Sequence, residues 1–123
     1  ARTVPVVVHP RACVSDSARL GDGTLVAAAA VINPDCVLGD AVIVNTGGTV
    51  DHDCRIGDGV HIAPGAHLAG GVCVGAGTLI GIGAVVKPEI HIGRNVVVGA
   101  GAVVVENLPD GVVAWGVPAR SRT

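Results

Sequence analysis

Aliphatic residues recur at every sixth position over nearly the whole chain, and no insertion shifts this frame. A second series lies four residues after the first and consists mostly of small residues, as at Ala12, Ala18 and Ala30. A period of six fits neither an amphipathic helix nor a flat strand. It is typical of hexapeptide repeats, in which tight turns join short strands into stacked coils. The aliphatic positions are Val8, Val14, Leu20, Val26, Ile32, Leu38, Val44, Val50, Ile56, Ile62, Leu68, Val74, Ile80, Val86, Ile92, Val98 and Val104.

The repeats predict an all-β solenoid, a hexapeptide β-helix, whose inward aliphatic side chains fill a narrow core. We expect one domain over 1–123, with coils over about 8–105 and a C-terminal cap over 106–123. A lead-in strand is expected over Val4–Val8. The cap should contain a turn at Asp110-Gly111 and a short strand ending at Trp115. We expect Trp115 to cover the last coil and the tail from Ser121 to be loose.

The composition agrees with a narrow core. Half of the residues are hydrophobic, yet the chain has no Phe, Tyr or Met and one Trp. The formal net charge is −2 and no basic stripe appears, which argues against nucleic acid as a partner. No apolar run reaches the ~18 residues of a membrane span. The first three residues lack the apolar run of a signal peptide. The cysteines, interpreted as small buried hydrophobic residues, lead us to expect a reducing, cytoplasmic location.

The cysteines and histidines give no pattern of metal ligands. The four cysteines form no CxxC pair, which makes a zinc knuckle an unfavoured interpretation. Cys36 and Cys54 are eighteen residues apart, so they should stack inward in neighbouring coils if a coil takes eighteen residues. No two of the five histidines are a multiple of eighteen apart. We therefore expect no metal within one subunit, while a site between subunits stays open.

The segment from Asn45 to Cys54 is the richest in candidate chemistry. His52 is the third residue of its repeat, which places it outward at a turn, and Asp51 and Asp53 flank it. A neighbouring carboxylate can fix the tautomer of an imidazole and raise its basicity, as a general base requires. The alternative is a solvated surface histidine. The same two interpretations apply to His61 and His67.

A rigid stack of coils offers little depth for a pocket, so a site needs a second surface. Prisms of this kind can associate side by side. The natural hypothesis is a homotrimer with sites between the subunits.

Several motifs together resemble a known family. They are N-T-x-x-x-V-x-H-[DE]-C at 45–54, I-G-D at 56–58, His61, the closing G-V-P-A-R at 116–120, and the opening His9-Pro10. This set is similar to bacterial sugar acetyltransferases of the sialic-acid O-acetyltransferase and UDP-4-amino-sugar N-acetyltransferase type. The resemblance covers almost the whole chain but only the C-terminal half of that family. Members of that family usually begin with an N-terminal nucleotide-sugar domain, which we expect to be absent from these 123 residues, whether they are the C-terminal half of a longer protein or recognise the acceptor differently.

The resemblance implies a left-handed parallel β-helix, a homotrimer and acetyl-CoA in the groove between subunits. It identifies His52 with the catalytic base and Asp53 with the acid that orients it. The remaining correspondences are Asn45 near the acceptor, His61 at the acetyl-CoA, Gly70 near the thioester, and Ile82 and Ala100 along the CoA arm.

The function hypothesis is therefore acetyl transfer from acetyl-CoA to an amino or hydroxyl group of a free or nucleotide-linked sugar. The acceptor is a small molecule, and no metal, nucleic acid or membrane partner is expected. Three alternatives remain open at this point: an acyltransferase for another small acceptor, a metalloenzyme like the γ-class carbonic anhydrases, and a non-catalytic solenoid.

Overall fold

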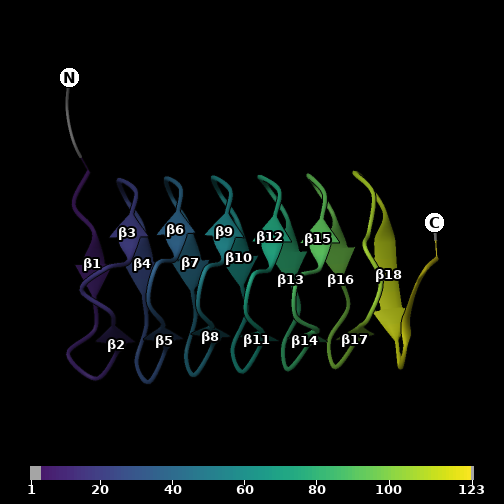
Figure 1. The fold of residues 1–123 in the computed structure, drawn as a ribbon, viewed down its shortest axis with the longest axis horizontal. Coiled ribbons are helices and arrows are strands. Elements are labelled where there is room, and N and C mark those ends of the chain that lie inside the picture. The colour runs from purple at the N-terminus through teal and green to yellow at the C-terminus, as the bar shows by residue number, and fades with distance from the viewer. Residues whose placement is uncertain (1–3, 123) are drawn as a thin grey trace.

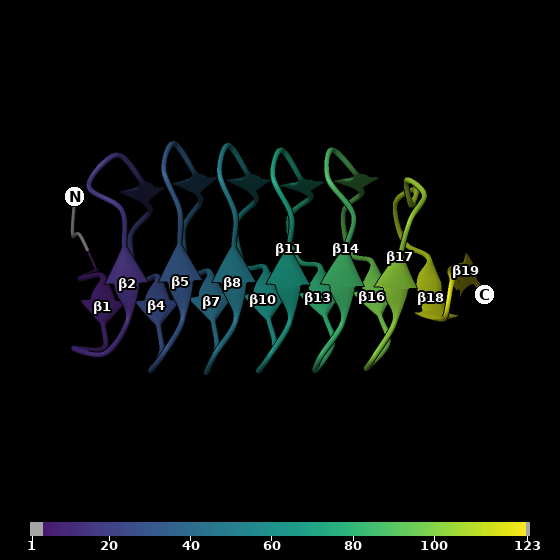
Figure 2. The ribbon, with the colours of Figure 1, turned by 60° about the horizontal axis from the view of Figure 1, so that its bottom comes forward.

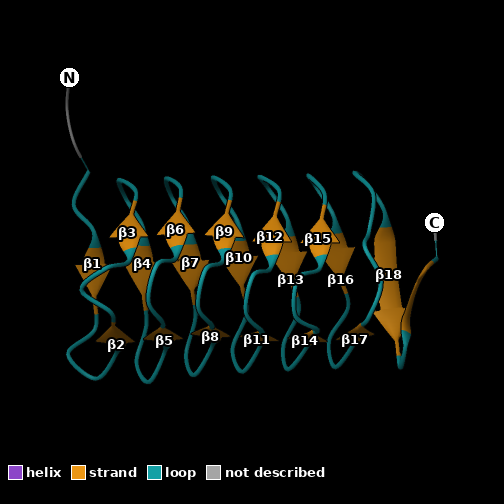
Figure 3. Cartoon of the chain, viewed as in Figure 1, coloured by secondary structure: helices purple, strands orange, loops and turns teal. Residues whose placement is uncertain are grey.

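The computed structural model describes residues 4–122 of the chain, so residues 1–3 and 123 lie outside the description. Short parallel strands stack along one axis, and the described residues contain no helix (Figures 1 and 3). Strands that neighbour each other in a sheet are three elements apart in the chain. Each coil therefore supplies one strand to each of three sheets, which form the three sides of a prism.

The three sheets are named A, B and C in chain order. Sheet A holds β1 (Val7–Val8), β4 (Leu25–Val26), β7 (Ile43–Val44), β10 (His61–Ile62), β13 (Leu79–Ile80), β16 (Val97–Val98), β18 (Val113–Gly116) and β19 (Ala119–Ser121). Sheet B holds β2 (Cys13–Val14), β5 (Val31–Ile32), β8 (Thr49–Val50), β11 (His67–Leu68), β14 (Val85–Val86) and β17 (Val103–Val104), aligned in Figure 2. Sheet C holds β3 (Arg19–Leu20), β6 (Val37–Leu38), β9 (Arg55–Ile56), β12 (Cys73–Val74) and β15 (His91–Ile92).

The register confirms that one coil takes eighteen residues. In sheet A, Val26 pairs with Val44, Val44 with Ile62, and Ile62 with Ile80. Each two-residue strand points its first side chain outward and its second inward because successive residues of a strand face opposite sides. In β13, Leu79 is 36% exposed and Ile80 is fully buried. The sixth-position aliphatic residues from Val26 to Val104 thus form the core, as the pattern predicts. Val14 and Leu20 are only partly buried against it. Val8, in the first coil, is 42% exposed because no coil precedes it, so the prediction is wrong for Val8.

Cys36 and Cys54 are both fully buried, which confirms the prediction that they point inward. Cys13 and Cys73 occupy the outward strand position, where Cys13 is exposed and Cys73 is half-buried. All four thiols are free.

Three rows of turns form the corners of the prism. Each corner is named after the two sheets that its turns join. The AB corner comprises 9–12, 27–30, 45–48, 63–66, 81–84 and 99–102. The BC corner comprises 15–18, 33–36, 51–54, 69–72 and 87–90, and the CA corner comprises 21–24, 39–42, 57–60, 75–78 and 93–96. Most of these turns contain one residue with positive φ, for which glycine has no steric cost. Asp53 (φ 58°) and Glu89 (φ 62°) adopt the same conformation at the BC corner.

The C-terminal segment closes the stack differently from the prediction. β18 pairs with β16 and turns back into the antiparallel β19. Ala114, Ala119 and Leu108 are the buried residues at this end, whereas Trp115 is 48% exposed. Trp115 is excluded from the core because it occupies an outward position of β18, and the Arg122 guanidinium lies 5.5 Å from the centroid of its ring. Ser121 thus belongs to the hairpin instead of a loose tail, and the backbone N–H of Arg122 donates to the carbonyl of Val113 at 2.7 Å. Thr123, the last residue of the expected tail, lies outside the described residues.

At the other end of the chain, the strand expected over Val4–Val8 is limited to Val7–Val8. No helix long and apolar enough to cross a bilayer occurs within residues 4–122.

Candidate functional site

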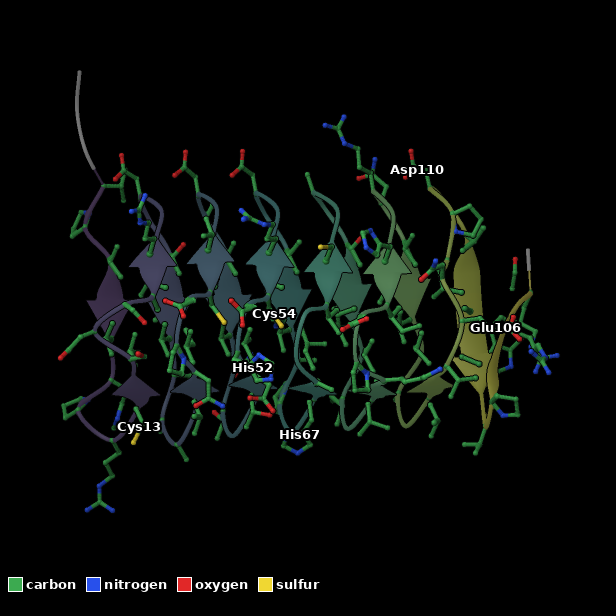
Figure 4. The ribbon with its side chains drawn as sticks, in the orientation of Figure 1. Cys13, His52, Cys54, His67, Glu106 and Asp110 are labelled. Atoms are coloured by element: carbon green, nitrogen blue, oxygen red, sulfur yellow. The ribbon has the colours of Figure 1, made fainter. Side chains whose placement is uncertain are left out.

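His52 lies in the BC corner between β8 and β9, near the middle of the stack (Figure 4). Its Nδ1 is 2.9 Å from Oδ2 of Asp53. An ionised carboxylate can only accept, so Nδ1 carries the proton and donates it to this hydrogen bond. Nε2 of the neutral ring then keeps its lone pair and is free to accept a proton from a substrate. The side chains of both residues are 63% exposed, so the pair is open to solvent.

The turn that carries His52 is fixed by the preceding coil. Oδ1 of Asp51 accepts a hydrogen bond from the His52 backbone N–H at 2.8 Å and another from Nδ2 of Asn33 at 2.9 Å. The backbone N–H of Asp53 donates to the carbonyl of Pro34 at 3.1 Å. These contacts hold both the backbone and the acidic partner of the imidazole in place.

The pKa of His52 is raised above its ordinary value. The main cause is the hydrogen bond to Asp53. Desolvation opposes it, and the negative charges of Asp51 and Asp53 raise the pKa further. The pKa of Asp51 is lowered, chiefly by the hydrogen bond from the His52 backbone and then by that from Asn33. Asp51 therefore stays ionised beside the imidazole.

Gly70 makes room for the imidazole in the next coil. A Cβ added at Gly70 would lie 2.5 Å from both Cε1 and Nε2 of His52. Such a distance is far inside van der Waals contact, so any side chain there would displace the ring. The imidazole borders a hollow of about 470 Å³ lined by Asp51, His52, Asp53, Ala69, Gly70, Gly71, Pro88 and Glu89.

A second group of candidate residues lies at the AB corner and on sheet A. Asn45 and His61 are linked by an Nδ2···Nε2 contact of 3.2 Å. Oδ1 of Asn45 accepts the backbone N–H of Thr46 at 2.8 Å, which assigns Nδ2 as the donor to His61. Neutral His61 therefore has its proton on Nδ1.

His61, Ile82 and Ala100 line a common groove of about 460 Å³, together with Ala63, Pro64, Leu79, Gly81, Val97, Val98 and Gly99. Ile82 is 61% exposed at the edge of this groove. The lining is almost entirely apolar apart from His61. Such a surface suits the extended aliphatic arm of a ligand more than a sugar.

The structure thus sorts the predicted site residues into two groups. His52, Asp53 and Gly70 meet at the BC corner, while Asn45, His61, Ile82 and Ala100 gather at the AB corner and sheet A. The strands of sheet B separate the two corners within one chain. A single chain therefore does not bring the imidazole of His52 to the groove beside His61.

Two further residues of the BC corner, Asn33 and Glu89, escaped the sequence analysis. Asn33 stands eighteen residues before Asp51, and Glu89 stands eighteen after Gly71. The spacing of one coil was the signal that could have found them.

The other histidine and cysteine candidates lie apart from both hollows. His67, on sheet B, makes a 2.7 Å hydrogen bond with Oγ1 of Thr49 and lines neither hollow. The thiol of Cys54 is buried and donates to the carbonyl of Ala69 at 3.2 Å, so it points into the core and is not placed to react with a substrate. Among residues 4–122, no three His, Cys, Asp or Glu side chains are grouped as metal ligands.

Comparison with known proteins agrees with this architecture. Residues 53–81 and 74–106 match the family model described as bacterial transferase hexapeptide (six repeats). Among curated protein sequences no match is found.

Several solved structures are similar over almost the whole chain. The acetyltransferase domain of PglB from Neisseria gonorrhoeae FA1090 is 48% identical with a TM-score of 0.95, and 98% of the present chain is covered. PerB from Caulobacter crescentus, solved with CoA and GDP-perosamine, is 50% identical with a TM-score of 0.97 and the same coverage. WeeI from Acinetobacter baumannii AYE is 33% identical with a TM-score of 0.93 over 96% of the chain.

The present chain spans 58% of the length of each of these three proteins. The fold is the left-handed parallel β-helix that the resemblance implied. The repeats, the register and these matches together show that the chain belongs to the hexapeptide-repeat family of bacterial transferases.

Proposed function

We propose that this chain is the catalytic β-helix of an acetyltransferase that moves an acetyl group from acetyl-CoA to an amino group of a nucleotide-linked sugar. The observation that carries the proposal is the His52–Asp53 pair, whose geometry leaves Nε2 unprotonated above a hollow. The similar structures support the choice of substrates. One PglB domain structure contains acetyl-CoA, and the PerB structure contains CoA and GDP-perosamine.

In the proposed reaction the amine of the acceptor attacks the thioester carbonyl of acetyl-CoA. Nε2 of His52 removes the proton that the nitrogen loses as the new C–N bond forms. The C–S bond then breaks, and the imidazolium returns the proton to the departing thiolate of CoA. Asp53 holds the ring and stabilises its protonated form throughout. Perosamine N-acetyltransferase from Caulobacter crescentus has been solved with one histidine replaced by Ala or Asn and with CoA and GDP-perosamine bound, which supports a functional role for a histidine in such a reaction.

The remaining candidate residues receive binding roles in this proposal. The apolar groove beside His61 holds the arm of CoA, with Ile82 and Ala100 along it. His61 contacts the acetyl-CoA near its reactive end, and Asn45, which donates to His61, lies close to the acceptor. Gly70, which lines the same hollow as His52, lies near the thioester.

We further propose that the active assembly is a homotrimer in which neighbouring copies join the two groups of residues. The outward row of sheet A is mostly aliphatic, with Leu25, Leu79 and Val97 between 36% and 39% exposed. Sheet B carries Val85 in the same position, 37% exposed. The outward row of sheet C instead includes Arg19, Arg55 and His91. Sheets A and B are therefore the faces suited to contact between subunits. The free thiols suit a reducing compartment such as the cytoplasm.

The experiment that tests this proposal pairs two inactive variants. His52→Ala and His61→Ala are each expected to lose acetyl transfer, by on the order of 10²–10⁴-fold in kcat for His52→Ala. Co-expression of the two should restore about a quarter of the wild-type activity, because one interface in four of a random trimer then combines an intact His52 with an intact His61 from the neighbour. Activity is measured with acetyl-CoA and GDP-perosamine, followed by a panel of amino sugars and hydroxyl sugars.

Co-expression of wild type with the double variant His52→Ala/His61→Ala is the matched control for assembly. Full activity of folded His52→Ala alone would contradict the catalytic role. Failure of the two single variants to complement each other in verified mixed trimers would contradict a site shared between copies.

A further inference from the structure

In the coil that follows His52, the BC corner contains two glycines, so the row of side chains along this corner has a gap next to the imidazole. His52-Asp53, Gly70-Gly71 and Pro88-Glu89 occupy the same two turn positions in three successive coils. The backbone N–H of Gly71 donates to the carbonyl of His52, and that of Glu89 donates to the carbonyl of Gly70, both at 2.9 Å. The glycines therefore form the floor of a notch between two walls, which are two strand spacings, or about 10 Å, apart.

Glu89 forms the wall of this notch opposite His52. It lines the hollow that contains the imidazole, and its Cγ lies 3.2 Å from the position that a Cβ on Gly71 would take. Its positive φ of 62° sets this direction. A glycine at 71 is thus what allows the Glu89 side chain to lie along the notch.

Glu89 differs from the other two carboxylates of the hollow. Asp53 is engaged by the imidazole, and Asp51 is engaged by the His52 backbone and Asn33. The Glu89 carboxylate, in contrast, makes no hydrogen bond or ion pair with any residue of the described part of the chain. No Lys or Arg lines the hollow; Lys87 belongs to the same turn as Glu89 but is not part of the lining.

We propose that Glu89 binds the ammonium form of the acceptor and makes this site prefer an amine over a hydroxyl. The inference rests on the proposed acetyl transfer and adds the residue that selects the acceptor. A free carboxylate attracts an ammonium group both by its charge and through a charge-assisted hydrogen bond. A neutral hydroxyl has no charge to be attracted and forms a weaker hydrogen bond with the carboxylate. Before the attack the ammonium releases one proton to the solvent in the open hollow, and the neutral amine then reacts beside His52.

The test compares Glu89→Gln with wild type in the assembled protein, using GDP-perosamine and its analogue in which a hydroxyl replaces the amino group. Glu89→Gln should raise the KM for the amine about fivefold, as expected for loss of one partly solvated ionic contact. The kcat and the KM for acetyl-CoA should stay within about twofold. Calorimetry should show the same loss for the amine and no change for the hydroxyl analogue. Asp16→Asn, at the same corner two coils before His52, is the matched control and should change neither ligand.

The possible outcomes separate this inference from the proposed function. The role of Glu89 is overturned if Glu89→Gln binds each ligand as tightly as wild type does. It is also overturned if the substitution weakens the binding of both ligands equally, or if neither ligand binds. If wild type transfers acetyl groups and Glu89→Gln behaves like wild type, the function stands and the inference fails. If wild type transfers none but Glu89→Gln still selectively weakens amine binding, the inference stands and the function fails.

Discussion

At the scale of single residues, the imidazole of His52 depends on three coils. Asn33 in the preceding coil holds Asp51, Asp51 and Asp53 hold the turn and the ring, and Gly70 in the following coil leaves space for the ring. None of these contacts is strong, since the ring is mostly exposed. Together they limit the imidazole to one orientation, which is the property a general base needs.

Replacing Gly70 should disable His52 without unfolding the chain. In Gly70→Ala the new methyl group would overlap Cε1 and Nε2 of the ring, so the imidazole must leave its position. We expect kcat to fall about tenfold or more, because misplaced catalytic groups lose a large part of their effect. Steady-state kinetics on purified protein with normal circular dichroism measures this loss.

Gly59→Ala provides the comparison. Gly59 lies at the CA corner with φ of 66° and open space around its Cβ position, so alanine there strains only the backbone. It should lower the free energy of unfolding by about 1 kcal/mol and leave kcat unchanged. If the two alanine variants had the same kcat, the steric role of Gly70 would be wrong.

The pH dependence of activity should reveal the Asp53 carboxylate. Its hydrogen bond raises the pKa of His52, and a general base works only when it is neutral. The acidic limb of the kcat/KM profile should therefore lie above the ordinary imidazole pKa of about 6.5. In Asp53→Asn this limb should move to lower pH while the plateau falls about tenfold or more. Asparagine tolerates the positive φ at this position, so the turn should persist. A limb that stays in place or moves to higher pH would contradict the assignment.

At the scale of elements, each strand of a repeat contains one outward and one inward residue, and their roles differ sharply. In β6, Val37 is 37% exposed and Leu38 is 2% exposed. Leu38→Ala should lower the free energy of unfolding by about 2–5 kcal/mol, because it leaves a cavity in a core that cannot collapse around it. Val37→Ala should cost less than about 1 kcal/mol. Chemical denaturation followed by circular dichroism measures both, and similar losses would mean that the inward column is not what stabilises the coil.

The aliphatic period allowed the coils to be predicted from sequence alone, because every coil obeys the same rule from Val8 to Val104. Trp115 was assigned wrongly because the cap has no repeat, so its orientation depends on the pairing of β18 with β16 and β19. His52 and Asp53 were found as sequence neighbours. Glu89 was not, since it lies two coils after Asp53 and the spacing of eighteen residues was applied to cysteines and histidines alone.

At the scale of the whole molecule, the three faces of the prism differ in chemistry, and this difference predicts how copies assemble. Val85 on sheet B and Val37 on sheet C are the same residue type and both 37% exposed. Val85→Arg should shift a trimer toward monomer and reduce acetyl transfer, because it places a charge on an apolar face that we propose to be buried between subunits. Val37→Arg should leave the assembly intact. Analytical ultracentrifugation at several protein concentrations measures this, and monomerisation by both variants or by neither would contradict the proposed faces.

The regular coil also acts as a unit of molecular length. Duplicating one set of eighteen residues between β12 and β13 would keep the hydrogen-bonding pattern of the sheets, with the new coil taking the place of β13 beside β10, but would carry Ile82 and Ala100 one strand spacing, about 4.8 Å, farther from His61. If the groove holds the arm of CoA as proposed, the length of the donor that fits is set in whole coils, and a protein of this design adapts to a longer acyl carrier by gaining a coil instead of reshaping a pocket.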